Sequence, residues 1–375
     1  MTTTIRITDP VDLVKVVPYQ LGYHPERSIV LIGLRRKQIG LVQRLDLPTL
    51  PRDCAAAAEL MSRHLLADGC TAAVLVVYED IEAEGALAGE TVASRLRNDR
   101  VQVVDHVVVR GERAFFPGPA GRIGRPVAGV ALPPDDRVPA VADYVAHGRQ
   151  PARSRDALDE RLAPSDDVLR ERVRLASVRL GVMRPVRGSR PRAMADWGAF
   201  LDVRDEAWFH GRLPSAAATA RMCHSLRDLQ VRDLISAWLC PGTLDLGVFD
   251  EDLQVLAAQH FPPRGRCAAK RGDDPSSCGA GRAGEGRSGV GADEELDSDR
   301  LVERMCWLAR HAPDLQAPAV LTVLATLTWH LGEGTLTRLA LDRALALEPG
   351  YRLALLLERM VDLAIRPGQA LSSTG

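Results

Sequence analysis

One block near the start of the chain, residues 21–48, constrains the fold more than any other segment. It reads LGYHPERSIVLIGLRRKQIGLVQRLDLP. Residues 28–34 form a continuous apolar run, which is typical of a strand that is buried on both faces. Residues 39–47 alternate between apolar and polar side chains, as in a strand with one buried face. With residues 35–38 as a turn between the two strands, the block predicts a β-hairpin.

Strands and helices alternate through the first 150 residues. We expect a short strand at Ile5–Thr8, followed by a helix that begins at Asp9 and Pro10 and ends near Gln20. Further along, the apolar patterns predict a helix over 53–68, a strand over 71–78, a helix over 82–98 and strands over 101–110 and 112–116. This order predicts an α/β sandwich around a mixed sheet in residues 1–150.

Strand signals stop after residue 150, and the pattern becomes helical. We expect helices over 153–163, 167–180, 194–209, 215–240 and 250–260. Residues 264–299 are rich in Gly, Ser, Arg and Asp and poor in large apolar side chains, which is typical of a disordered linker. The fold class that follows is an N-terminal α/β sandwich and an all-helical C-terminal region. We divide the chain into an α/β domain at 1–150, a helical region at 151–263, a linker at 264–299 and a helical hairpin at 300–367.

Composition limits the classes of protein that the chain can form. Its 375 residues suit two or three domains, and 46% of them are hydrophobic, which is enough to fill those cores. A net charge of −1 argues against general electrostatic attraction to nucleic acid or to anionic membranes. No apolar run reaches the roughly 18 residues of a membrane span, so no membrane association is expected.

Cysteine usage and the N-terminal residues point to a cytoplasmic location. The seven cysteines are odd in number, and no pair is spaced as CxxC. This suits free thiols rather than disulfides or a zinc site. The first residues, MTTTIRITDPVD, lack the basic and apolar pattern of a secretory signal. We therefore expect a cytoplasmic protein without a metal.

Familiar catalytic and nucleotide-binding motifs are missing or out of context. The string G-A-G-R-A-G at Gly279–Gly284 matches a dinucleotide-binding fingerprint. That site needs a strand before it and a helix after it, whereas this string lies inside the predicted linker. The chain also lacks a P-loop lysine motif, HExxH and GxSxG. We therefore assign no catalytic residue and expect no cofactor.

The segment 317–351 resembles one tetratricopeptide repeat. The apolar, small, Gly and Pro positions of that repeat are occupied by Leu324, Ala325, Gly332, Leu341, Ala344, Leu345 and Pro349. Residues Tyr351–Ile365 would supply the next helix. A solenoid normally needs about three repeats to bury a continuous core, so two interpretations stay open. The hairpin is either plain core against the preceding helices or part of a peptide-binding groove.

Residues 172–194 hold seven arginines and no acidic residue. Arginine makes bidentate contacts to phosphate, so a surface for phosphate or nucleic acid is one interpretation. No aromatic residue is interleaved for base stacking, and the low net charge of the chain argues in the same direction. A solvated face is the simpler interpretation, and nucleic-acid binding is the weakest of our functional hypotheses.

Polar side chains near the predicted strands mark a candidate ligand site in the α/β domain. The candidates are His24, Arg44, Asp46, Tyr78, Asp80 and Asp105. Those that end the strand over 71–78 fit the rule that ligands gather at the carboxyl ends of parallel strands. Asp105 interrupts an apolar run and needs a partner such as Arg44 or Arg110. A structural ion pair is the alternative for Asp105, and a surface loop position is the alternative for His24.

Four segments of the chain resemble the actinobacterial family known as domain of unknown function 4192. They are residues 21–48, SRDALDERLAP at 154–164, VRDLISAWL at 231–239 and RALALEPGYRLALLL at 343–357. The resemblance covers most of the chain and implies no catalytic residue, because none is established for the family. Members place cysteines after the strand at 101–110. This chain has FFPGPAGRIGRPVAG there, so no metal or thiol role is expected at that position.

Two functional hypotheses follow. In the first, the chain is an interaction or regulatory protein, with an α/β scaffold or sensor domain and a C-terminal helical region that binds a protein partner. The repeat-like hairpin and the lack of a catalytic motif favour this hypothesis. In the alternative, the chain is an enzyme or small-molecule-binding protein with a polar site in residues 1–150.

Overall fold

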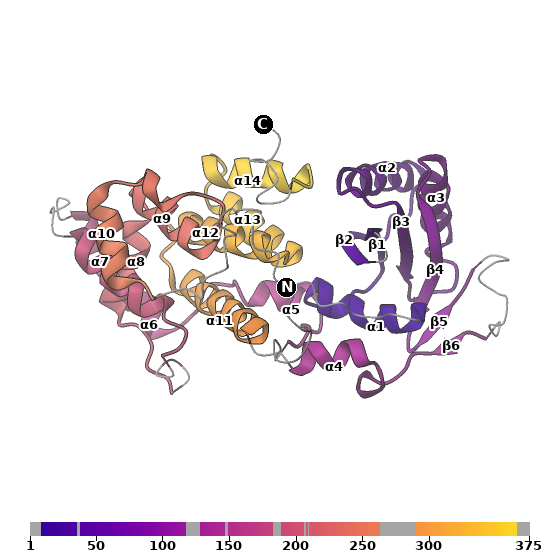
Figure 1. Ribbon diagram of the computed structural model, residues 1–375, viewed down its shortest axis with the longest axis horizontal. Helices are drawn as coiled ribbons and strands as arrows, with labels where there is room; N and C mark the ends of the chain where they lie inside the picture. The colour runs from indigo at the N-terminus through magenta and orange to yellow at the C-terminus, as the bar shows by residue number, and fades with distance from the viewer. Residues whose placement is uncertain are drawn as a thin grey trace, which may run out of the picture.

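The computed structural model describes residues 9–35, 38–117, 128–146, 149–182, 189–205, 208, 210–262 and 290–365. An α/β part, drawn in indigo to purple in Figure 1, lies beside a helical part drawn in pink to yellow. The expected strand at Ile5–Thr8 and the Gly279–Gly284 string lie outside the described residues.

The α/β part is built on a six-stranded sheet of order β2-β1-β3-β4-β5-β6. Its strands are β1 (Ser28–Arg35), β2 (Gln38–Asp46), β3 (Ala72–Tyr78), β4 (Gln102–Arg110), β5 (Arg113–Phe115) and β6 (Val130–Ala131). β3 and β4 pair in parallel, whereas the other neighbouring strands are antiparallel. β1 and β2 form the predicted hairpin. The mixed sheet that the sequence predicts is confirmed.

Helices account for the rest of the regular structure. They are α1 (Pro10–Leu21), α2 (Pro51–Ala67), α3 (Ala86–Asn98), α4 (Pro139–Ala146), α5 (Arg155–Glu160), α6 (Val168–Val182), α7 (Ser189–Leu201), α8 (Ala216–Ser225), α9 (Leu229–Leu239), α10 (Glu251–His260), α11 (Val290–His311), α12 (Ala317–Leu331), α13 (Gly334–Leu347) and α14 (Arg352–Asp362). Short 3₁₀ turns lie at Asp135–Arg137 and Leu246–Val248. After β6 the described residues hold helices and no strand, so the all-helical C-terminal region is confirmed.

Both faces of the sheet are covered, which explains the continuous apolar run of β1. α2 and α3 lie on one face and α1 lies on the other (Figure 1). Ile29 and Leu31 belong to the buried cluster under α2 and α3. Val30 and Ile32 belong to the cluster under α1. Successive side chains of a strand point to opposite faces, so the central positions Ile29 to Ile32 are all apolar.

Local signals set both ends of α1. Asp9 Oδ1 accepts a hydrogen bond from the backbone N–H of Val11 at 2.9 Å, and Pro10 occupies the first turn. Gly22 ends the helix with a φ of 80°, a conformation that glycine adopts without strain. The predicted helix start at Asp9 and Pro10 is therefore explained by a side-chain cap.

α12 lies at the centre of the helical part. Its buried residues include almost the whole run from Ala317 to Thr328. α9, α11 and α13 pack against it. A helix that is apolar all round is stable only when neighbouring elements surround it. The first helix of the repeat-like segment is therefore part of the hydrophobic core.

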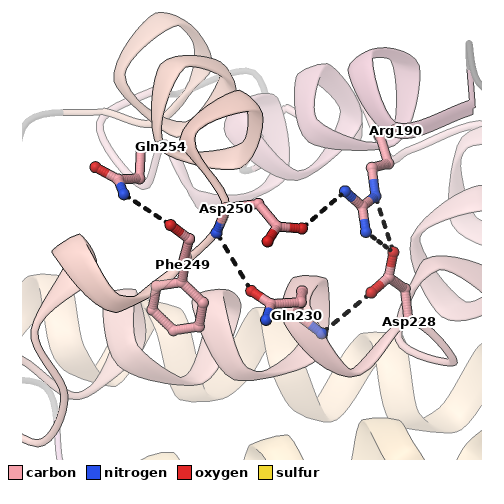
Figure 2. A network of polar contacts seen from close by, with 6 residues as sticks. All are labelled: Arg190, Asp228, Gln230, Phe249, Asp250 and Gln254. Atoms are coloured by element: carbon pink, nitrogen blue, oxygen red, sulfur yellow. Dashed lines mark hydrogen bonds and ion pairs between the residues drawn. The ribbon is translucent and has the colours of Figure 1, made fainter.

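The helix expected over 215–240 is two helices, α8 and α9. Asp228 starts the second one, because its Oδ1 accepts a hydrogen bond from the backbone N–H of Gln230 at 3.1 Å. Its Oδ2 accepts from Arg190 Nε and Nη2 of α7, at 2.9 and 2.6 Å. Figure 2 shows that Arg190 also reaches Asp250, so one guanidinium ties α7 to the starts of α9 and α10. The apolar periodicity continues through this break, but the helix does not, because Asp228 caps the start of a new helix.

α11 begins at Val290, so the last part of the predicted linker over 264–299 is helical. The residues from 263 to 289 lie outside the described part of the chain. Buried Leu301, Met305 and Leu308 anchor the helix on the core.

We expect Gly198→Ala to destabilise the protein. Gly198 of α7 lies against α10, and a Cβ there would overlap the backbone carbonyl of His260. Because backbone cannot move aside as a flexible side chain can, the cost should be about 2 kcal/mol. Gly181→Ala in α6 is the control, because nothing lies within 4 Å of its Cβ position and alanine favours helix. Urea unfolding measures both, and equal changes in the two variants would contradict the close approach.

His106 should make stability fall in mild acid. Burial, with a smaller contribution from the charge of Arg97, lowers the pKa of His106 to about 4. Histidine in an unfolded chain titrates near 6.5, so the folded state resists a proton that the unfolded state accepts. Stability is then lost as pH falls from about 6.5 to about 4, by at most about 3 kcal/mol. Urea unfolding across this range should show a smaller loss for His106→Gln than for the parent, and an unchanged loss for the exposed control His24→Gln.

Candidate functional site

Three of the predicted ligand residues lie on one face at one end of the sheet. Asp46 of β2 is opposite Ser28 of β1, and Ser28 is opposite Tyr78 of β3. Residues opposite one another on neighbouring strands share a face. Arg44 lies two residues before Asp46, so it points to the same face. This is the α1 face, since Tyr78 packs against the same cluster as α1.

Arg44 is the centre of the polar contacts at this end of the sheet. Arg44 Nη1 lies 2.5 Å from Asp46 Oδ1, and Arg44 Nη2 donates to the backbone carbonyl of Glu26 at 3.4 Å. The guanidinium carbon of Arg44 lies 5.9 Å from the ring centroid of Tyr23. We call the group Tyr23, Ser28, Arg44, Asp46 and Tyr78 the sheet-end cluster.

Several polar atoms of the sheet-end cluster are buried without a partner. Ser28 Oγ, Arg44 Nε and Tyr78 Oη have no hydrogen-bond partner among the described residues. Ser28 is fully buried, and burial raises the pKa of Tyr78. An unsatisfied buried polar group costs about 1–3 kcal/mol. The inner part of the cluster, at Ser28, Arg44 and Tyr78, therefore has hydrogen-bonding capacity that its own residues do not use, whereas the Asp46 carboxylate is exposed to solvent.

The other predicted residues lie apart from the cluster. His24 is exposed in the loop after α1, where its backbone N–H donates to the carbonyl of Ala152 at 3.0 Å. Asp80 is exposed beyond the end of β3. Asp105 is on the same face as Tyr78, but β4 places Val109 beside Tyr78, so Asp105 lies about 13 Å further along the strand. The six candidates do not converge on one site.

Glu79 shows why Arg110 is not available to Asp105. Arg110 Nη2 lies 3.0 Å from Glu79 Oε1. The buried Glu79 carboxylate also accepts from the backbone N–H groups of Gly85 at 2.9 Å and Ala83 at 3.3 Å. This carboxylate therefore orders the loop between β3 and α3, and its role is structural.

A large cavity lies where the α/β part meets the helical part, and no pattern in the sequence predicted it. Its volume is about 890 Å³. We call it the junction cleft. It is lined by residues 19–22 at the end of α1, residues 149–152, Leu158 and Arg161 at α5, Trp208, Leu213, residues of α11 from Asp299 to Arg310, and residues 331–336 between α12 and α13. In Figure 1 these elements surround α5, between the two parts of the molecule.

One wall of the junction cleft is aromatic and tightly held. The rings of Trp208 and Trp307 meet edge to face, with centroids 5.3 Å apart. The guanidinium of Arg304 lies 4.9 Å from the centroid of Trp208. Arg304 Nη1 in turn donates to the backbone carbonyls of Phe200 at 2.7 Å and Asp202 at 2.9 Å. These contacts give the wall a defined shape.

Charged side chains of both signs face the junction cleft. Arg149 binds Asp299 through two hydrogen bonds of 3.2 and 3.3 Å, and this pair joins the segment after α4 to α11. Arg161, Arg310 and Glu333 also line the cleft. Their side chains make no hydrogen bond and no ion pair within the described residues.

Glu333 is the carboxyl that burial perturbs most clearly in the cleft. It lies in the turn between α12 and α13, after Gly332, whose φ is 84°. Burial raises the pKa of Glu333, and the negative charge of Asp299 adds to the effect, while Arg149 and Arg161 oppose it. A desolvated acid facing a cleft is a recognised mark of a functional site. The sequence pattern that could have pointed to Glu333 is a charged residue between two glycines, in the turn between two apolar helices.

The described ranges contain neither a metal-binding cluster nor a helix that could span a membrane. There, no three His, Cys, Asp or Glu side chains lie close enough together to hold a metal ion. None of the helices in that part of the chain combines the length and the apolar character that crossing a bilayer requires. Most of the FFPGPAGRIGRPVAG stretch after β4, residues 118–127, lies outside the described residues.

Fold and cleft together define the class of protein: an α/β part joined to a helical part, with a polar cleft at the junction. The chain matches the family model described as domain of unknown function (DUF4192) over residues 10–270 and 295–368, and it belongs to this family. No curated protein matches the chain, and no solved structure matches it.

Tyr78→Phe should leave the protein at least as stable as the parent. The substitution removes a buried hydroxyl that has no partner among the described residues, so we expect a gain of up to about 1 kcal/mol in the free energy of unfolding. Tyr19→Phe is the control, because the Tyr19 hydroxyl donates to Asp135 at 3.3 Å, and its loss should cost about 1 kcal/mol. Thermal unfolding measures both. A clear loss in Tyr78→Phe would show that the hydroxyl has a bound partner.

Proposed function

We propose that this protein is a regulatory protein whose junction cleft binds a small polar molecule. The main observation behind this proposal is the cleft itself, which has a volume of about 890 Å³ and is lined by charged side chains of both signs. Ligand sites are concave, occur at the junctions between domains and place a few polar groups on otherwise apolar walls. The aromatic wall and the desolvated Glu333 fit this description.

A bound molecule would contact both parts of the protein. The end of α1 and the segment at 149–152 form one side of the cleft, and α11 with the turn after α12 forms the other. Binding would therefore stabilise one arrangement of the two parts over others. This is how the α/β part would act as a sensor for the helical part, and it supports a regulatory function over a purely structural one.

The helical part is our proposed site for a protein partner. α12, α13 and α14 follow one another in the order of a tetratricopeptide-like hairpin and its next helix. Because α12 is buried, the surface available to a partner is on α14, where Leu355, Leu356 and Leu363 are exposed. We further propose a cytoplasmic location, since Cys54 and Cys306, like the other described cysteines, are free thiols and suit a reducing compartment.

A second candidate site is the sheet-end cluster within residues 1–150. Its support is the set of buried polar atoms without a partner, on Ser28, Arg44 and Tyr78. Such a site would take a much smaller ligand than the junction cleft, because Ser28 is completely enclosed.

A thermal-shift screen with the full chain tests the proposed function. The panel would hold nucleotides, sugar phosphates, amino acids, dicarboxylates and polyamines. A compound present at 100 times its Kd should add about 2.7 kcal/mol of stability. We expect a hit that the double variant Arg161→Gln, Glu333→Gln loses and that Asp46→Asn, in the sheet-end cluster, keeps. The reverse pattern would favour the second candidate site, and a panel without hits would count against both.

A further inference from the structure

We infer that the junction cleft selects a zwitterion, namely a free amino acid or a short peptide with both ends free, through Glu333 together with Arg161 and Arg310. The inference rests on the proposed function and names the class of ligand. It follows from which charged side chains line the cleft and which of them are already held by ion pairs.

The ammonium group of such a ligand would bind at Glu333. Asp299 lies close enough to Glu333 for its charge to act on that carboxyl, but Asp299 is already bound by Arg149 through two hydrogen bonds. Glu333 therefore keeps an acceptor without a donor, in a place where water is partly excluded. A cation supplies the missing donors, and charge-assisted hydrogen bonds are about twice as strong as neutral ones.

The carboxylate of the ligand would bind at Arg161 and Arg310. Arg161 ends α5, and Arg310 lies in the last turn of α11. Neither side chain has a hydrogen bond or ion pair within the described residues. The planar guanidinium of arginine matches a carboxylate in a bidentate way. Both arginines are exposed to solvent on the cleft side, so a ligand can reach them.

Cys306 lies in the wall of the cleft. Its thiol is buried, and the charges of Arg161, Glu333, Glu303 and Arg310 act on it. Burial raises the pKa of Cys306 to about 12, so the thiol is neutral and unreactive. Both arginines and the Glu333 carboxyl line the same cleft of about 890 Å³, so one ligand in that cleft can contact groups of both signs.

Other classes of small molecule fit the cleft less well. Four arginines and three carboxylates line it. A nucleotide or another polyanion would leave its charge beside Glu333, and a polyamine would leave its charge beside the arginines. Like charges brought close together in a partly dry site repel. A neutral sugar would leave both signs uncompensated, whereas a zwitterion neutralises both.

Isothermal titration calorimetry with the full chain tests this inference. The probes are the free L-amino acids and trialanine, and each binder is then compared with its N-acetyl form and its C-terminal amide. The inference expects at least one free probe to bind, and each modification to weaken binding by about tenfold or more. Glu333→Gln should bind the free and N-acetyl forms with similar Kd values. The double variant Arg161→Gln, Arg310→Gln should bind the free acid and the C-terminal amide with similar Kd values.

The control variant is Glu90→Gln, which changes an exposed carboxyl on α3 and should keep the parent's preferences. The inference is overturned if no free amino acid and no trialanine binds, or if the N-acetyl and amide forms bind as tightly as the free probe. If another class of compound binds in the cleft while every zwitterion fails, the proposed function stands and this inference falls. If no compound of any class binds there, both fall.

Discussion

One hydrophobic core joins the sheet to the helical part, and the junction cleft depends on it. Val30 and Val76 on the α1 face of the sheet belong to the same buried cluster as Leu324 and Leu339 of the helical part. Tyr23 belongs to that cluster too. Protein interiors are packed as densely as organic crystals, so the two parts cannot separate without exposing this shared apolar surface. The cleft is therefore a hollow beside a continuous core rather than a gap between two independent bodies.

An ion pair crosses the same junction, but it orients the two parts more than it holds them together. Arg149 binds Asp299 across the junction, and within the helical part Arg155 of α5 lies 3.7 Å from Asp342 of α13. Pairs that are open to solvent contribute at most about 1 kcal/mol each, which is small beside the burial of even one large apolar side chain. Such pairs are weak enough for a ligand to compete with them and specific enough to define which groups face the cleft.

Much of the fold was open to prediction because its signals are local. The apolar run of β1 and the Asp9–Pro10 start of α1 needed only neighbouring residues. The break before α9 was not predictable from periodicity, because the apolar pattern continues through it, and Asp228 acts together with Arg190 from another helix. The junction cleft could not be predicted either, because it also depends on residues that are distant in the sequence. Its lining comes from residue 19 to residue 336, and no local pattern joins positions so far apart.

The two candidate sites differ in what their polar groups would gain from a ligand. In the sheet-end cluster, Ser28 is completely enclosed, so any bound group would have to be small and already inside. In the cleft, Glu333 bears the cost of partial burial while remaining within reach of solvent. A charge kept in that position opposes stability until something neutralises it. Neutralisation by a ligand that also touches the end of α1 would add stability across the junction, which is the physical basis for linking binding in the cleft to the state of the helical part.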